Sequence, residues 1–263
     1  MIPKVIHYCW FSGEEMSPFI KKCMNTWKEK LPDYKLRLWD ANSFDFDSVP
    51  FVREAYKAKK WAFVTDYVRL YALYTEGGIY MDTDVKVMKN FDEFLNYNFF
   101  TSHEIHPFFY NNSEQKKLDN TFKLIDNNTF IEGFGVQAAI MGSIKGLPYL
   151  KDCLNYYNSL TFDLNKYPIT NYIIGKHITR NILKYGYCFI DKNQLLTDNM
   201  MIFESKYFVG NALYLKEDSY AIHLCNSSWT ENANSLTNRI RNNFPLISPL
   251  WFFMYKVWKR LFH

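Results

Sequence analysis

The chain has 263 residues, 48% of them hydrophobic and 19% aromatic, and its formal net charge is +4. This length and composition can bury a large core, which excludes general disorder. The basic residues are spread along most of the chain, so the concentrated positive surface of a nucleic-acid-binding protein is also excluded.

The five cysteines are odd in number and widely spaced, without a C-x-x-C pair. This pattern indicates neither a disulfide framework nor a zinc site. No apolar run reaches the roughly 20 residues that span a bilayer, and the N-terminus lacks the pattern of a signal peptide. We therefore expect a cytoplasmic protein.

The start of the sequence predicts an α/β opening. Residues 3 to 10 form a short apolar run typical of a buried strand, in which we expect His7 to be a hydrogen-bonded structural histidine. Ser17 can cap a helix that begins at Pro18 and ends before Pro32. Residues 34 to 39 alternate as a second strand, which predicts a parallel pair with a right-handed crossover.

A long helical stretch follows at residues 51 to 76, and we expect it to contain two helices that end at Gly77 and Gly78. Residues 79 to 81 then predict a strand, and residues 85 to 88 resume the alternation. The residues between these two runs therefore lie at a strand end, which is where ligands bind in open α/β sheets.

The second half of the chain is less regular. Residues 103 to 130 are polar and rich in Asn, and we expect a flexible insertion over the site. Further helices are predicted over residues 147 to 160 and 169 to 185.

Asp82 and Asp84 carry the clearest chemical signal. In an extended strand their side chains would share one face, and in a turn both could reach one hard cation such as Mn²⁺ or Mg²⁺. Such a cation neutralises the charge that develops on a departing diphosphate. A lone D-x-D also occurs as solvated turn chemistry in many unrelated proteins, so the motif does not decide the function by itself.

Three separated blocks together resemble glycosyltransferase family 32, whose relatives include yeast-type mannosyltransferases, bacterial capsular polysaccharide transferases and the catalytic domains of clostridial glucosylating toxins. The first block is residues 3 to 13 (PKVIHYCWFSG), and the last is residues 220 to 229 (YAIHLCNSSW). The central block, residues 63 to 87, carries the ordered set Thr65, Asp66, Arg69, Gly77, Gly78, Tyr80, Asp82 and Asp84.

The resemblance implies an α/β fold of the glycosyltransferase-A type, with a mostly parallel central sheet flanked by helices. It implies a retaining enzyme that uses Mn²⁺ or Mg²⁺ to move a hexose from a nucleotide-sugar, expected to be UDP-linked, to a glycan or a lipid-linked glycan. Bacterial surface polysaccharide synthesis is the implied setting. Front-side attack and a covalent intermediate both remain open, and we favour front-side attack because no nucleophile stands out in the sequence.

The resemblance also assigns roles to single residues. The metal would be bound by Asp82, Asp84 and His223, and Asp66 and Arg69 would position the donor sugar. The implied donor-binding residues are Trp10, Tyr80, Gln137, Ser228 and Trp229, with Trp10 stacking on the uracil. From the residues alone, Asp66 and Arg69 could instead form a structural ion pair, Trp10 could belong to the core, and His223 could be an exposed neighbour of core residues.

We expect a catalytic domain over residues 1 to 238 and a basic, aromatic tail over residues 239 to 263. The tail suits the inner face of the plasma membrane, or it could form a terminal helix packed on the domain. Two other functions stay open for the whole chain. These are a metal-dependent nucleotide-sugar hydrolase or nucleotidyltransferase, and a non-catalytic carbohydrate-binding protein.

Overall fold

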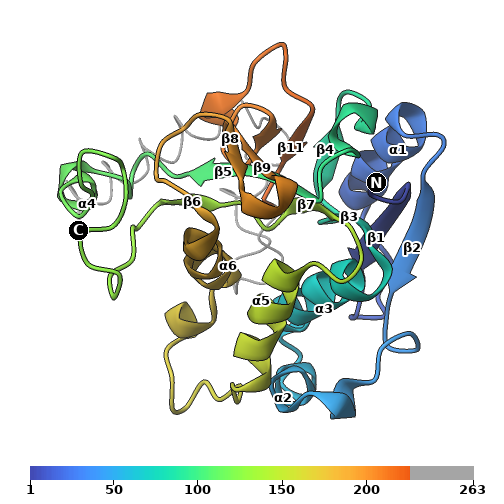
Figure 1. Cartoon of the computed structure of the whole chain (residues 1–263). Helices are drawn as coiled ribbons and strands as arrows, with labels where there is room; N and C mark the ends of the chain where they lie inside the picture. The colour runs from blue at the N-terminus through green and yellow to red at the C-terminus, as the bar shows by residue number, and fades with distance from the viewer. Residues whose placement is uncertain (226–263) are drawn as a thin grey trace, which may run out of the picture.

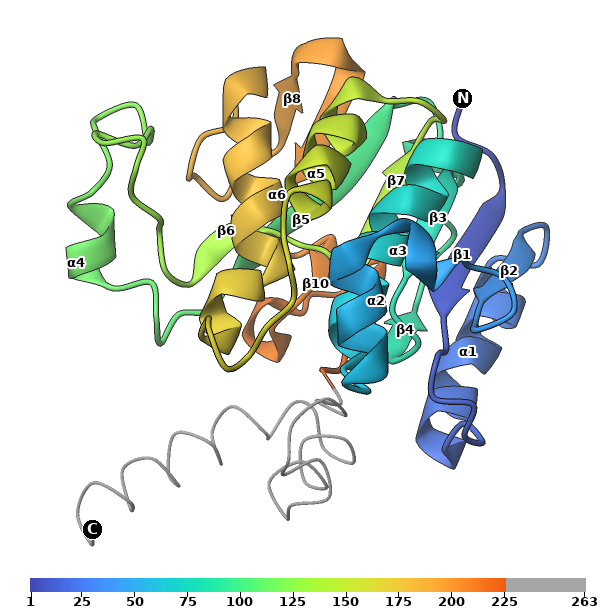
Figure 2. The same ribbon diagram turned by 90° about the horizontal axis from the view of Figure 1, so that it is seen from below.

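The computed structural model describes residues 1–225, apart from the side chains of Ile169 and Thr170. A large sheet has the strand order β2-β1-β3-β7-β5-β9-β8, with β6 paired to β5, and a smaller sheet has the order β10-β11-β4. Helices α2, α3, α5 and α6 lie on one side of the large sheet, and α1 lies on the other side with the small sheet (Figure 1). Figure 2 shows the helical side from below.

The opening of the chain folds as its pattern predicts. Strand β1 (Val5–Cys9) leads to helix α1 (Pro18–Lys30) and then to β2 (Lys35–Trp39), which pairs in parallel with β1. The Ser17 hydroxyl accepts a hydrogen bond from the backbone N–H of Ile20 at 3.3 Å, so the expected cap is present. Pro18 is the first helical residue, where its missing N–H costs nothing.

The predicted long helical stretch is indeed divided in two, α2 (Pro50–Lys57) and α3 (Trp61–Glu76). Gly77 and Gly78 end α3 with φ values of 70° and 114° and lead into β3 (Gly78–Met81). A Cβ at Gly78 would lie only 2.7 Å from the Val5 carbonyl oxygen. Only glycine therefore allows β3 to start so close to β1.

His7 on β1 is buried and fully hydrogen-bonded, as expected. Its Nδ1 accepts from the indole N–H of Trp39 at 3.1 Å, so its Nε2 donates to the carbonyl oxygen of Gly77 at 2.7 Å. The histidine thus ties the end of α3 to the first strand.

The remaining elements complete the large sheet and its helical layer. They are β5 (Phe99–Ile105), α4 (Asn112–Gln115), β6 (Phe134–Val136), β7 (Ile140–Ser143), α5 (Pro148–Asn158), α6 (Ile174–Ile182), β8 (Gln194–Leu196) and β9 (Met200–Phe203). Short 3-10 helices lie at Phe46–Ser48, Asp92–Phe94, Ile169–Tyr172, Leu183–Tyr185, Thr197–Asn199 and Ala212–Tyr214. The helices predicted over residues 147 to 160 and 169 to 185 therefore correspond to α5 and α6 with its 3-10 extensions.

Strand directions confirm the predicted α/β class and add antiparallel members to the sheet. Strands β2, β1, β3, β5 and β9 run in one direction, whereas β7 and β8 run in the opposite one. The small sheet consists of β4 (Val85–Val87), β10 (Phe208–Val209) and β11 (Ala221–His223). The chain therefore passes from one sheet to the other directly after β3.

Neighbouring residues of β3 belong to different apolar clusters because side chains of a strand alternate between its faces. Tyr80 belongs to the cluster shared with α3 and α5, and Ile79 and Met81 belong to the cluster around Trp27 of α1. Tyr80 therefore points toward the helical layer, where α3 lies.

The segment at residues 103 to 130 begins inside β5 and then forms α4, which lies at the side of the molecule away from α1 (Figure 1, Figure 2). Among the described residues, no helix is both long and apolar enough to cross a membrane.

Candidate active site

Asp82 and Asp84 lie in the turn between the two sheets. The backbone N–H of Asp82 donates to the carbonyl oxygen of Ala139 at 2.9 Å, and the carbonyl oxygen of Asp82 accepts from the N–H of Val85 at 3.0 Å. The first bond fixes the turn to the residue before β7, and the second closes it. Both carboxylates therefore stand at a strand end, as predicted.

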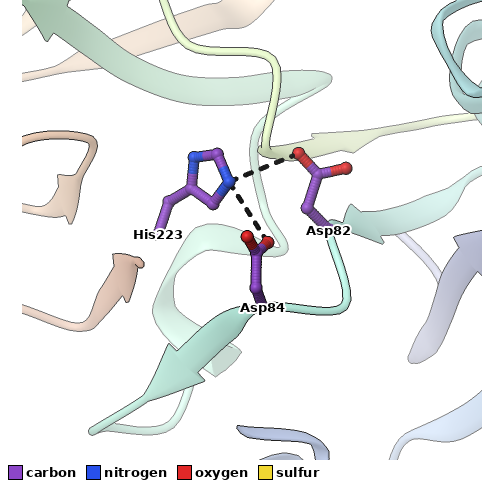
Figure 3. Close-up of side chains that lie close together, drawn as sticks. All are labelled: Asp82, Asp84 and His223. Carbon is purple, nitrogen blue, oxygen red and sulfur yellow. Dashed lines mark ion pairs between the residues drawn. The ribbon is translucent and has the colours of Figure 1, made fainter. Parts of the chain in front are cut away.

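His223 reaches this turn because β11 pairs antiparallel with β4, which places His223 opposite Val85. Its Nε2 lies 3.2 Å from Oδ1 of Asp84 and 3.8 Å from Oδ2 of Asp82 (Figure 3). The backbone N–H of Leu224 also donates to the Asp84 carbonyl oxygen at 3.2 Å. The pairing of two short strands thus unites residues that are far apart in the sequence.

The three side chains form a group that could hold a cation. Each offers one ligand atom, and these atoms all lie within 4.8 Å of one another. Two carboxylate oxygens and one imidazole nitrogen are a donor set suited to Mn²⁺, and carboxylates also suit Mg²⁺. The residues present therefore fit the predicted cofactor.

Arg69 of α3 lies next to Asp82 and is almost fully buried. Its Nη2 is 3.0 Å from Oδ1 of Asp66, and its Nη1 is 3.3 Å from Oδ1 of Asp82. The same Nη1 donates to the carbonyl oxygen of Ala138 at 2.8 Å. One guanidinium therefore connects two carboxylates and the chain before β7, which is the bridging geometry that arginine provides.

Tyr80 completes the support of Asp82. Its hydroxyl donates to Oδ1 of Asp82 at 2.6 Å, and the Arg69 guanidinium lies 4.6 Å from the centre of its ring. Arg69 Nη1 lies near both oxygens of Asp82, 3.3 Å from Oδ1 and 3.4 Å from Oδ2, and Oδ2 is the oxygen nearer to His223. This arrangement orients the carboxylate before any ligand arrives.

Electrostatics at the site follow from burial and shared charge. Burial raises the pKa of Asp66 to about 7, with a further contribution from Asp82, and Arg69 opposes the rise. Burial lowers the pKa of His223, but Cys225 and Asp84 outweigh it and hold this pKa well above the usual value of 6.5. The negative charges around His223 therefore favour a cation at this position, either a proton or a metal ion.

Trp10 follows the end of β1 and is half-buried, and it belongs to none of the apolar clusters of residues 1–225. Its indole N–H donates to the carbonyl oxygen of Glu14 at 2.7 Å. The preceding residue, Cys9, is buried close enough to Arg69 and Asp82 for their charges to affect its thiol. The core alternative for Trp10 is thus not what is observed, and its role in donor binding stays a prediction.

Gln137 is buried next to the site. Its Nε2 donates to the carbonyl oxygen of Phe208 at 2.7 Å, whereas its Oε1 has no hydrogen-bond partner among the described residues. An unsatisfied buried oxygen is uncommon in native proteins. Ser228 and Trp229 lie outside the described residues, as does the whole tail from residue 239.

Glu104 and His106 were not singled out by the sequence. Glu104 stands near the end of β5, and its Oε1 lies 3.4 Å from Nε2 of His106. Both are close enough to His223 for their charges to interact. The available signal was an E-x-H pattern at the end of an apolar run, but it falls in the segment interpreted as an insertion.

Residues 18–101 match the family model of the glycosyltransferase sugar-binding region containing the DXD motif. The match includes Asp66, Arg69, Asp82 and Asp84. The chain is a glycosyltransferase. An uncharacterized glycosyltransferase of Acanthamoeba polyphaga mimivirus is 28% identical over 237 residues, which cover 87% of this chain and 84% of that relative.

A second relative is similar over a shorter stretch. The initiation-specific alpha-1,6-mannosyltransferase of Candida albicans is 32% identical over 103 residues, or 35% of this glycosyltransferase and 27% of the relative. Among solved structures, the PaToxG glycosyltransferase has a TM-score of 0.48 at 17% identity, with 70% of this chain and 69% of that chain covered. The family model and the two relatives confirm the resemblance to D-x-D glycosyltransferases.

Proposed function

We propose that this glycosyltransferase is a retaining, divalent-metal-dependent enzyme that moves a hexose from a nucleotide-sugar to a glycan or a lipid-linked glycan. The observation that carries the proposal is the group of Asp82, Asp84 and His223, whose ligand atoms lie within 4.8 Å of one another beside the buried Arg69. We further propose a UDP-linked donor and a role in bacterial surface polysaccharide synthesis, in line with the family resemblance of the sequence.

In this proposal Asp82, Asp84 and His223 hold Mn²⁺ or Mg²⁺. When bound, the ion supplies positive charge to the diphosphate that leaves the sugar. Arg69 and Tyr80 hold Asp82 in place through the contacts at 3.3 Å and 2.6 Å. Because these contacts exist before the donor arrives, little reorganisation is needed when the donor binds.

Asp66 and Arg69 position the donor sugar. Asp66 is buried and shares Arg69 with Asp82, so its second oxygen is suited to accept a hydrogen bond from a sugar hydroxyl. Trp10 gives the nucleoside a flat, half-exposed indole beside the end of β1. Ser228 and Trp229, proposed to close over the diphosphate, lie outside the described part of the chain.

For the chemical step we propose front-side attack. The acceptor oxygen bonds to the anomeric carbon while the bond from that carbon to the phosphate oxygen breaks. The electron pair of the broken bond stays on the diphosphate. The proton of the acceptor hydroxyl passes to an oxygen of the leaving phosphate. We propose that Gln137, whose buried Oε1 has no hydrogen-bond partner among the described residues, faces the anomeric carbon.

The test is release of the nucleotide from a panel of UDP-glucose, UDP-galactose and GDP-mannose with Mn²⁺, with and without glycan acceptors. GDP-mannose is included because the Candida albicans relative is named a mannosyltransferase. Transfer that requires Mn²⁺ and an acceptor supports the proposal, whereas release that ignores the acceptor indicates a hydrolase. Glycan binding that ignores both nucleotide and metal indicates a carbohydrate-binding protein.

The proposed location is cytoplasmic, at the inner face of the plasma membrane through residues 239 to 263. Deletion of residues 246 to 263 tests it. The protein should move from the membrane fraction to the soluble fraction and should keep its activity on a free glycan. A shortened protein that stays with the membrane fraction contradicts this location.

A further inference from the structure

A cavity of about 250 Å³ lies beside the site, between α6, β6 and the chain that leads from β5 to β6. Aromatic and aliphatic side chains dominate its lining, and Glu104 and His106 contribute a polar end. Its volume is slightly below the ~300–1,000 Å³ of pockets for drug-sized ligands. It therefore has room for one ring-sized molecule.

The segment from Gly135 to Ala138 connects the cavity with the surroundings of the candidate metal centre. Gly135 and Val136 of β6 line the cavity, and two residues later the carbonyl oxygen of Ala138 accepts from Arg69 at 2.8 Å. Glu104, at the polar end, is close enough to both Arg69 and His223 for their charges to interact with its carboxylate. An occupant of the cavity can thus present one end to the place where the donor sugar is proposed to bind.

The charges of the lining select the chemistry of the occupant. Lys176 is paired with Glu132 at 2.7 Å, and Arg180 donates to a backbone carbonyl of the neighbouring loop at 2.8 Å. Both cations also lie against the ring of Phe130. Within the described lining, Lys176 is thus paired with a carboxylate and Arg180 is held by a backbone carbonyl, and the carboxylate of Glu104 stands at the polar end.

A neutral sugar suits these surroundings. Its apolar ring face can pack against the aromatic wall, and its hydroxyls can donate to Glu104. An anionic group at the polar end would be repelled by the carboxylate of Glu104, and the charge of Lys176 is already paired with Glu132.

We propose that this cavity binds the terminal sugar of a neutral glycan acceptor, with Glu104 accepting a hydrogen bond from one of its hydroxyls. The inference rests on the proposed function, because it assigns the acceptor of the same site. His106 positions Glu104 through their contact at 3.4 Å.

Gly175 offers a direct test because it lines the cavity near the start of α6, and a Cβ built there meets no atom within 4 Å. Gly175→Phe should fill the cavity without straining the backbone, and Gly175→Ala is the matched control that leaves it open. Saturation-transfer NMR would use methyl glucopyranoside, galactopyranoside and mannopyranoside as probes. We expect a signal from at least one probe with the native protein and with Gly175→Ala, and its loss with Gly175→Phe.

Glu104→Gln provides a second variant that keeps the size of the side chain. It should weaken binding of the responding glycoside about 10- to 100-fold, because a hydrogen bond to a charged acceptor is lost. Glu204→Gln, on a carboxylate outside the cavity lining, should leave binding unchanged. Equal binding by Glu104→Gln and the native protein would overturn the assignment of Glu104.

Three further results would overturn the proposal. They are no signal from any neutral glycoside, a signal that survives Gly175→Phe, and a stronger signal from methyl glucuronide or decanoate. Calorimetry of the native protein with UDP and Mn²⁺ separates this inference from the proposed function. If UDP fails to bind, the UDP-linked donor of the proposed function fails, and the glycoside result is still judged by its own controls.

Discussion

Arg69 Nη1 lies 3.3 Å from Oδ1 of Asp82, so a buried residue of helix α3 holds one carboxylate of the candidate metal centre in place. Arg69 also compensates Asp66 at 3.0 Å. Its removal would leave two carboxylates without their shared cation, one of them buried. The contact therefore serves both the fold and the site.

Arg69→Met should lower the free energy of unfolding by about 3–5 kcal/mol, because breaking a buried ion pair leaves uncompensated charge. Urea denaturation measures this change. Arg37→Met is the control, since Arg37 is exposed and its ion pair with Glu76 spans 3.6 Å at the surface. This variant should change the free energy of unfolding by less than about 1 kcal/mol. Similar losses of unfolding free energy for the two variants would show that the buried ion pairs of Arg69 do not stabilise the fold.

Asp84→Asn should reduce Mn²⁺ affinity at least about 10-fold, since a charged ligand to the cation is lost. The folded protein should persist, because the substitution keeps the size of the side chain and the backbone N–H of Leu224 bonds the main chain of Asp84. Calorimetric titration with Mn²⁺ and a thermal melt measure the two effects. Asp33→Asn, at an exposed position, is the control and should change neither the Mn²⁺ affinity nor the melting temperature. Unaltered Mn²⁺ affinity in Asp84→Asn would exclude the proposed centre.

The affinity for Mn²⁺ should rise with pH. Burial lowers the pKa of His223, but Cys225 and Asp84 raise it to a value well above 6.5. The metal must displace the proton from this imidazole, so below that pKa each pH unit should strengthen binding by up to about 10-fold. Titrations at pH 6, 7 and 8 measure the slope. His223→Gln should flatten it, and a native affinity that stays constant over this range would speak against His223 as a ligand.

Trp10→Ala should weaken UDP binding about 5- to 150-fold if the indole stacks on the base, since such stacking contributes about 1–3 kcal/mol. Inorganic pyrophosphate with Mn²⁺ is the internal control, because it lacks a base and its affinity should not change. Calorimetry compares the two ligands on both proteins. Equal losses for UDP and pyrophosphate would place the effect of Trp10 elsewhere.

Gly78→Ala and Gly146→Ala separate steric crowding from backbone strain. Both glycines have positive φ, 114° and 77°, but a Cβ at Gly78 would lie 2.7 Å from the Val5 carbonyl oxygen, whereas one at Gly146 meets no atom within 4 Å. Gly146→Ala should cost about 1–2 kcal/mol, and crowding should add roughly 1–3 kcal/mol at Gly78. Urea denaturation measures the free energy of unfolding of both variants. Equal losses would show that the start of β3 shifts to make room for the added methyl group.

The local signals of the sequence predicted the first half of the fold well. A cap at Ser17, paired glycines after α3 and an alternating run at residues 34 to 39 each act over a few residues, and each led to the observed element. They also placed Asp82 and Asp84 at a strand end, because that position depends only on the strand before it.

The less predictable features depend on contacts between distant segments. Strand β7 is buried at every residue and shows no alternation, so its antiparallel direction had no local signal. His223 was indicated by the family resemblance alone, since its place beside Asp84 requires the pairing of β4 with β11. Glu104 was missed because its importance comes from a cavity that β6 and α6 build around it.

The position of β11 late in the chain has a consequence for biosynthesis. Because synthesis proceeds from the N-terminus, α3, β3 and the aspartate turn leave the ribosome long before the segment that carries the histidine. A nascent chain that has reached only β9 holds two of the three ligands and lacks the strand that pairs with β4. Competence to capture the ion would then arise only as β11 docks on β4, which would couple the onset of activity to the synthesis of β11.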